Sequence, residues 1–151
     1  MNKKTLFLAA ILFLSLNAFA LDLGLIAGSV SLPASSSSFF YGLSAGSGTI
    51  VPMLKFEFEG CRIKETGWDT LSAAVKFRPK FGIFAPYAVL GAGGMFEKLN
   101  FHFSDYRFYT FMGGGFHLFF ASMFSLRFDL RFLHFSDLNQ TRISGGFFIH
   151  L

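Results

Sequence analysis

Two polar residues near the carboxyl end of the chain, His134 and Ser136, stand two positions apart. On an extended strand such residues point to the same face, so an imidazole and a hydroxyl would lie side by side. A pair of this kind can act as general base and nucleophile, because histidine can take the proton of an attacking serine hydroxyl. We favour a polar strand end that meets lipid headgroups and predict no catalytic residues. The alternative is that His134 and Ser136 are a catalytic pair.

Other residue types that could do chemistry have spacings typical of structure. The histidines stand at positions 102, 117, 134 and 150, and no His-x-x-x-His spacing occurs among them. Because Cys61 is the only cysteine, we predict neither a metal site nor a cofactor. The glycines at 91, 93, 94 and 113–115 are not followed by the Lys-Ser/Thr pair of a phosphate-binding loop. They are typical of strands that curve and pack closely.

In the segments that contain these residues, apolar and polar residues alternate with a period of two. Across residues 124–132, Phe and Leu alternate with Ser, Arg and Asp, and residues 53–61, 70–78 and 141–151 repeat the pattern. Such alternation predicts strands with one apolar and one polar face. A soluble β-sandwich would need a broad polar surface. Here the polar face has few residues, and its Arg residues are accompanied by Glu and Asp. The apolar face has almost no polar residues and resembles a lipid-facing belt.

The number of segments fits a closed barrel. We predict an all-β fold, an eight-stranded antiparallel transmembrane β-barrel, because such barrels have an even number of strands of about ten residues. The predicted strands cover residues 22–32, 39–49, 53–62, 69–78, 86–97, 106–118, 124–134 and 141–151.

The interior of so narrow a barrel is filled by side chains. Buried charges persist only when they are paired, so the polar face predicts a salt-bridge network, with a conduction path as the alternative. The predicted inward charges are Lys55, Glu57, Glu59, Lys76, Arg78, Arg107, Arg127, Asp129, Arg131 and Arg142. His117 and His150 share the inward face and should join the network, and Cys61 should be a packed or rim thiol. Trp68, Tyr106 and Tyr109 lie near strand ends and should form part of an aromatic girdle.

The first twenty residues have the pattern of a cleaved signal peptide. Lys3 and Lys4 precede the apolar residues 6–14, and Ala18 and Ala20 form a small-x-small cleavage site. The alternative is an uncleaved membrane helix. We therefore expect a signal peptide at 1–20 and a barrel domain at 21–151. A chain that is 52% hydrophobic and 15% charged is not disordered, and a net charge of +4 without a basic run does not favour nucleic acid.

Two segments resemble the small outer-membrane β-barrel proteins. Pro86-Tyr87-Ala-Val-Leu-Gly91-Ala-Gly93-Gly94 resembles a Pro-Tyr then Gly-x-Gly strand of that family. Residues 113–118 and 124–132 resemble the penultimate hairpin of the same family, which includes the membrane domain of outer membrane protein A. The resemblance implies the outer membrane of a Gram-negative-type bacterium, contact with its lipid including lipopolysaccharide, and insertion by the outer-membrane assembly machinery. The chain ends in Leu151 rather than in the family's usual aromatic residue.

The His134-x-Ser136 pair is similar to one in the lipid A 3-O-deacylase family, which is also an eight-stranded outer-membrane barrel. The similarity implies a Ser136 nucleophile and a His134 base. The chain has Asp137 where that family has Asn, and no Glu follows Glu97 to orient the histidine. We therefore predict a monomeric, porin-like small barrel with a structural or surface-interaction role. The alternative is a deacylase-type esterase.

Overall fold

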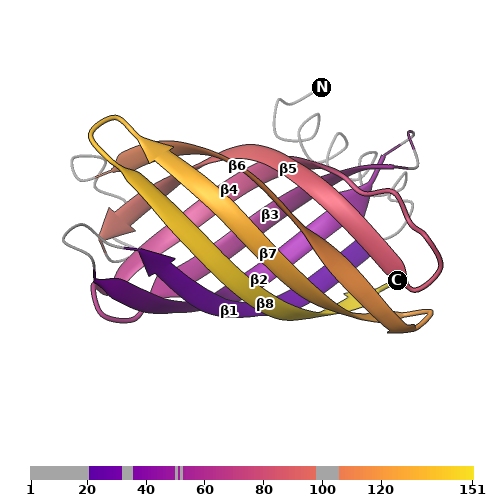
Figure 1. Ribbon diagram of the computed structural model, residues 1–151. Helices are drawn as coiled ribbons and strands as arrows, with labels where there is room; N and C mark the ends of the chain where they lie inside the picture. The colour runs from indigo at the N-terminus through magenta and orange to yellow at the C-terminus, as the bar shows by residue number, and fades with distance from the viewer. Residues whose placement is uncertain (1–20, 32–35, 50, 52, 98–105) are drawn as a thin grey trace, which may run out of the picture.

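In the computed structural model, residues 21–31, 36–49, 51, 53–97 and 106–151 are described. Eight antiparallel strands form a closed barrel in which each strand pairs with the next and β8 pairs with β1 (Figure 1). The strands are β1 (Leu21–Ser31), β2 (Ser37–Gly48), β3 (Leu54–Ile63), β4 (Trp68–Phe77), β5 (Phe84–Glu97), β6 (Arg107–Ala121), β7 (Phe124–Phe135) and β8 (Asn139–His150). The predicted fold class is confirmed. The strand ends shift by a few residues, most at β6, which continues to Ala121.

Several predicted features lie outside the described residues: the signal peptide at 1–20, residues 32–35, Pro52, and the connection at 98–105 with His102. No helix in the described part of the chain is long and apolar enough to cross a membrane.

The two ends of the barrel differ in what they carry. At one end, which we call the terminal end, Leu21 N donates to Leu151 O at 3.1 Å and Leu151 N donates to Leu21 O at 2.8 Å. The opposite end, which we call the loop end, carries the turns at residues 64–67 and 136–138. Gly67 has a φ of 68°, a left-handed conformation that glycine adopts without steric cost.

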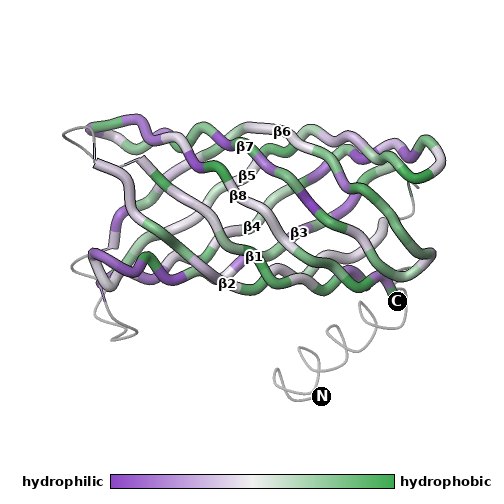
Figure 2. The backbone as a smooth tube through the Cα atoms, turned by 60° about the horizontal axis from the view of Figure 1, so that its bottom comes forward, coloured by the Kyte–Doolittle hydropathy of each residue, from purple (hydrophilic) through white to green (hydrophobic). Residues whose placement is uncertain are grey.

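The outer wall is apolar and the interior is charged. Along β7, buried and exposed residues alternate strictly, with Arg127 and Arg131 inside and Phe128 and Leu130 outside. Figure 2 shows the same alternation of hydrophobic and hydrophilic positions along the barrel. A water-soluble sandwich has the opposite arrangement, because it buries its apolar face. An apolar wall around a polar interior is the design of a transmembrane β-barrel.

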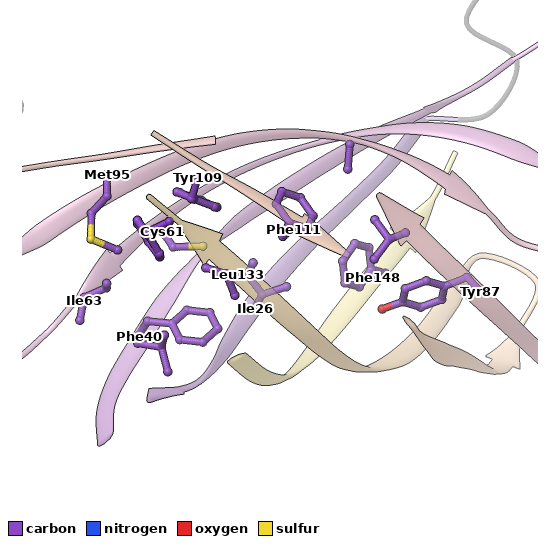
Figure 3. Close-up of a cluster of buried hydrophobic side chains, with 14 residues drawn as sticks. Ile26, Phe40, Cys61, Ile63, Tyr87, Met95, Tyr109, Phe111, Leu133 and Phe148 are labelled. Atoms are coloured by element: carbon purple, nitrogen blue, oxygen red, sulfur yellow. The ribbon is translucent and has the colours of Figure 1, made fainter. Parts of the chain in front are cut away.

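Apolar side chains also fill part of the interior (Figure 3). Tyr109 is only 2% exposed and lies in this cluster, so the prediction of a girdle position for it was wrong. The odd-numbered residues of β6 face inward, and this parity takes Tyr109 into the lumen. Trp68 is likewise partly buried against the cluster, whereas Tyr106 is exposed. Cys61 is buried in the cluster as a packed thiol.

Candidate functional site

Two carboxylates of β3 face two guanidinium groups of β7 across the lumen. Arg127 donates from Nη1 to Glu57 Oε2 at 2.9 Å and from Nη2 to Glu59 Oε1 at 2.7 Å. Arg131 donates from Nη2 to Glu57 Oε1 at 2.7 Å and from Nη1 to Glu59 Oε2 at 3.0 Å. The barrel walls thus hold four charges in a crossed arrangement, in which each guanidinium bonds both carboxylates.

Three further charges complete this group, which we call the lumen network. Lys76 donates to Glu57, Arg142 Nη2 donates to Glu59 Oε2 at 2.6 Å, and Arg131 Nε lies 2.8 Å from Asp129 Oδ2. The network therefore has four cations and three carboxylates, and all seven side chains are at most 7% exposed. Buried charges are tolerated where ion pairs and hydrogen bonds offset their desolvation, and this network meets that condition.

Most of the predicted inward charges lie where the alternation placed them. Lys55 and Arg78 approach Asp22 near the terminal end, at 3.8 and 3.0 Å. The prediction for Arg107 was wrong, because its side chain is 51% exposed. Arg107 is the first residue of β6 and lies at the rim of the loop end, where it faces the Trp68 ring at 5.3 Å and Asp137 at 3.7 Å.

A second hydrogen-bonded group lies near the terminal end. His150 Nδ1 is 2.7 Å from Asp22 Oδ1, and His150 Nε2 is 2.7 Å from Ser125 Oγ. His117 Nδ1 approaches the same hydroxyl at 2.9 Å. The predicted inward placement of both histidines is confirmed. Their partners Ser125 and Asp22 were not predicted. Ser125 is placed by the register of the β6–β7–β8 hairpins, and Asp22 is brought to His150 by the pairing of β1 with β8 that closes the barrel.

This group has the order Ser–His–Asp, but its serine is closed off. Ser125 is fully buried, and its single hydroxyl lies between two imidazole rings. One assignment of protons satisfies the chain: Ser125 donates to His150 Nε2, His150 Nδ1 donates to Asp22, and His117 Nδ1 donates to Ser125. A nucleophile must reach its substrate, so the group acts as a structural tie between four strands.

The alternative catalytic pair, His134 and Ser136, lies on the outer wall at the loop end. His134 is exposed on the lipid-facing side of β7, and Ser136 is exposed just after the strand ends. His134 Nδ1 lies 2.6 Å from Asn139 Oδ1, and the two residues are cross-strand partners. The histidine thus has the side-chain amide oxygen of Asn139 as its hydrogen-bond partner. Among the hydrogen bonds of the described residues, none joins His134 to Ser136.

Two hollows on the outer wall meet at His134. One, of about 470 Å³, lies towards Arg107 and Ser136, and the other, of about 430 Å³, lies towards Asn139 and Phe132. Both are open on the side where a bilayer would contact the barrel. Asn139 was not predicted as the partner of His134. The register of the β7–β8 hairpin is the signal that could have identified it.

Within the part of the chain that the structure describes, no group of three His, Cys, Asp or Glu side chains is placed to hold a metal ion.

The fold is shared with solved outer-membrane proteins. The N-terminal β-barrel domain of OprF from Pseudomonas aeruginosa superposes with a TM-score of 0.68 at 12% identity, over 86% of this chain and 97% of that one. Neisserial surface protein A gives 0.61 at 14% identity over 86% and 95%. The outer membrane enzyme PagL gives 0.53 at 15% identity over 85% and 98%. No family model and no curated protein matches the sequence. The chain therefore has the fold of the small eight-stranded outer-membrane barrels.

Proposed function

We propose that this protein is a small barrel of the outer membrane of a Gram-negative-type bacterium, with a structural or surface-interaction role and a closed lumen. The observation that carries the proposal is the lumen network, in which Glu57, Glu59, Arg127 and Arg131 span the interior from opposite walls. Eight-stranded barrels are filled by side chains, and this one is filled by groups that hold one another in place. The terminal end is then periplasmic and the loop end extracellular.

Reconstitution into planar bilayers tests whether the lumen is closed. The wild-type protein should give no stepwise conductance above that of protein-free bilayers, while a general porin in the same lipid should give clear steps. Regular unitary steps from the wild-type barrel would contradict a closed lumen.

Surface display is tested by labelling intact cells with a membrane-impermeant maleimide. Asp137→Cys places a thiol in the exposed β7–β8 turn at the loop end, and it should be labelled. The matched control, Ser122→Cys, lies in the exposed β6–β7 turn at the terminal end and should be labelled only after the cells are broken. The native Cys61 is buried and should not be labelled. Labelling of Ser122→Cys alone in intact cells would reverse the proposed orientation.

We also propose that the assembly machinery recognises the end of β8, where Phe147, Ile149 and Leu151 share the outward face. Leu151→Phe should raise the yield of folded barrel in cells, and Leu151→Asp should lower it, at equal rates of synthesis.

We also propose that the protein is a monomer. Light scattering of the detergent-purified protein should give the mass of one chain after the detergent is subtracted.

The second candidate function is hydrolysis of an ester in an outer-leaflet lipid such as lipid A. The observation that favours it is His134, which faces lipid between two hollows while Asn139 holds its Nδ1. In this reaction His134 Nε2 takes the proton of Ser136 as Oγ attacks the ester carbonyl. The lipid alcohol leaves with that proton, and water then hydrolyses the acyl-serine to release the fatty acid. Histidine with an amide partner is a known variant of the triad.

Mass spectrometry of lipid A from cells with and without the gene tests the esterase function. The enzyme should remove one acyl chain, Ser136→Ala should abolish this change, and Asn139→Ala should reduce it. Lys64→Gln, in the exposed β3–β4 turn at the same end of the barrel, lies outside both hollows; it is the control and should leave the acylation pattern of the active protein unchanged. Identical lipid A with and without the expressed gene would exclude this activity and leave the closed-barrel proposal intact.

A further inference from the structure

A groove follows the outer wall across β1 to β5, and residues of β8 line it on one side and Tyr106 and Phe108 on the other. It consists of two hollows of about 640 and 940 Å³, both lined almost entirely by apolar groups. The hollows adjoin, because Leu25, Leu43, Gly60 and Leu71 line both of them. We call the two together the wall groove. It begins near Arg62 at the loop end and continues towards Phe58, about 13 Å along β3 at the usual rise per residue.

Gly60 makes this groove deep, and barrel packing does not require a glycine there. A Cβ added to Gly60 would meet only Leu71 Cδ2, at 3.3 Å, and one added to Gly145 would meet Arg127 O at 3.7 Å. By contrast, a Cβ on Gly28 or Gly42 would collide with the backbone of the neighbouring strand. Gly60 and Gly145 both face outward and both line the hollow of about 640 Å³, so their missing side chains open space on the lipid side.

A fixed cation stands at the loop end of the groove. Arg62 is the only Lys or Arg on the outward face of the eight strands, and its side chain is 51% exposed. Asp69 accepts hydrogen bonds from Arg62 Nε and Nη2, both at 2.8 Å, and so holds the guanidinium plane against the wall. The Nη1 edge is left for a further acceptor. A cation on a lipid-facing wall is costly unless it meets polar partners, so Asp69 offsets part of this cost and an acceptor at the Nη1 edge would offset more.

We propose that the wall groove binds one lipid of the outer leaflet, a phosphorylated glycolipid of the lipid A type, with an acyl chain along Gly60 and a phosphate on Arg62. Charge and place support this occupant. Guanidinium groups suit phosphate geometry, and Arg62 lies at the end that the proposed orientation makes extracellular, where this lipid forms the leaflet. The inference goes beyond the proposed structural role and does not use His134 or Ser136, so it stands or falls separately from esterase activity.

Native mass spectrometry of the full barrel in detergent, with diphosphoryl lipid A as the probe, tests this site. The wild type should retain one lipid A more tightly than further lipids. Gly60→Leu fills the groove and Arg62→Gln removes the cation, and each should weaken that first binding about tenfold or more. Ala88→Leu places the same side chain on the outward face of β5 outside the groove and should bind as the wild type does.

Dephosphorylated lipid A and phosphatidylglycerol separate headgroup from chain recognition. Removing the phosphates should weaken binding to the wild type but change little for Arg62→Gln. Equal affinity for phosphatidylglycerol would overturn the assignment to lipid A. Equal binding by the wild type, Gly60→Leu and Arg62→Gln would show ordinary annular lipid and end the proposal. Folding of each variant is checked by heat-modifiable gel migration, and Gly145→Leu replaces Gly60→Leu if the latter does not fold.

Discussion

At the scale of single residues, the carboxylates of the lumen network should be more sensitive to substitution than its guanidinium groups. Glu59 bonds Arg127, Arg131 and Arg142, so Glu59→Gln leaves four cations against two carboxylates. Arg131→Gln leaves three cations against three carboxylates. Because breaking a buried ion pair leaves an uncompensated charge, Glu59→Gln should lower the free energy of unfolding by about 3–5 kcal/mol, and Arg131→Gln by less.

Urea unfolding in detergent micelles measures this order. The double variant Glu59→Gln/Arg142→Gln has three cations against two carboxylates and should recover part of the loss. If Arg131→Gln proved the more damaging single change, the crossed ion pairs of the lumen network would not govern stability.

Glu65, in the turn between β3 and β4, gives a prediction about pH. Ser38 donates a hydrogen bond to its carboxylate, as does Phe39 N at 2.9 Å, and the Ser38 bond lowers the pKa of Glu65 below the usual 4.5. A lowered pKa in the folded state stabilises the protein above the unfolded pKa, and this stabilisation is lost as pH falls through the folded pKa.

The amide resonance of Phe39, followed by NMR in micelles, should therefore titrate with a midpoint below pH 4.5. Glu65→Gln is the control and should abolish the titration. A midpoint at or above 4.5 would mean that Ser38 and Phe39 do not hold the carboxylate.

At the scale of the element, β7 shows how one strand serves two environments. Its outward face presents Phe128 and Leu130 to lipid, and its inward face carries Arg127, Asp129 and Arg131. Leu130→Arg places a charge near the middle of the wall and should cost about 2–4 kcal/mol of folding free energy.

Folded yield in liposomes measures this cost. The control is Met123→Arg, in the turn at the terminal end, where an added charge near the interface should cost about 0–1 kcal/mol. Equal folded yields for Leu130→Arg and Met123→Arg would mean that this face of β7 does not contact the hydrocarbon core.

At the scale of the whole molecule, closure is the main structural fact. β1 pairs with β8 from Asp22↔His150 to Val30↔Arg142, so the described sheet has no free edge. An unheated barrel should therefore resist SDS and migrate differently from the boiled chain on a gel. Circular dichroism in detergent should show a β-rich spectrum before boiling. Identical migration of heated and unheated samples, or a monodisperse soluble protein without detergent, would contradict a closed membrane barrel.

The sequence alone determined the fold class and most of the side-chain placement. A period of two assigns each residue to one of two faces, and an apolar face opposed by paired charges distinguishes a lipid-facing wall from a soluble core. For this reason the alternation by itself predicts Glu57, Glu59 and Arg131 inside the barrel, where all three are buried. The same parity placed His134 on the outer wall.

The tertiary structure decided which residues meet. Parity does not say how far a residue lies along the barrel axis, so Arg107 was expected inside although it lies at the rim. Parity also does not give cross-strand register, and register alone pairs His134 with Asn139. The tie from Asp22 through His150 and Ser125 joins the first strand to the last two. Its Asp22–His150 contact, between residues 128 positions apart, exists only because the sheet closes, which no local pattern in the chain can specify.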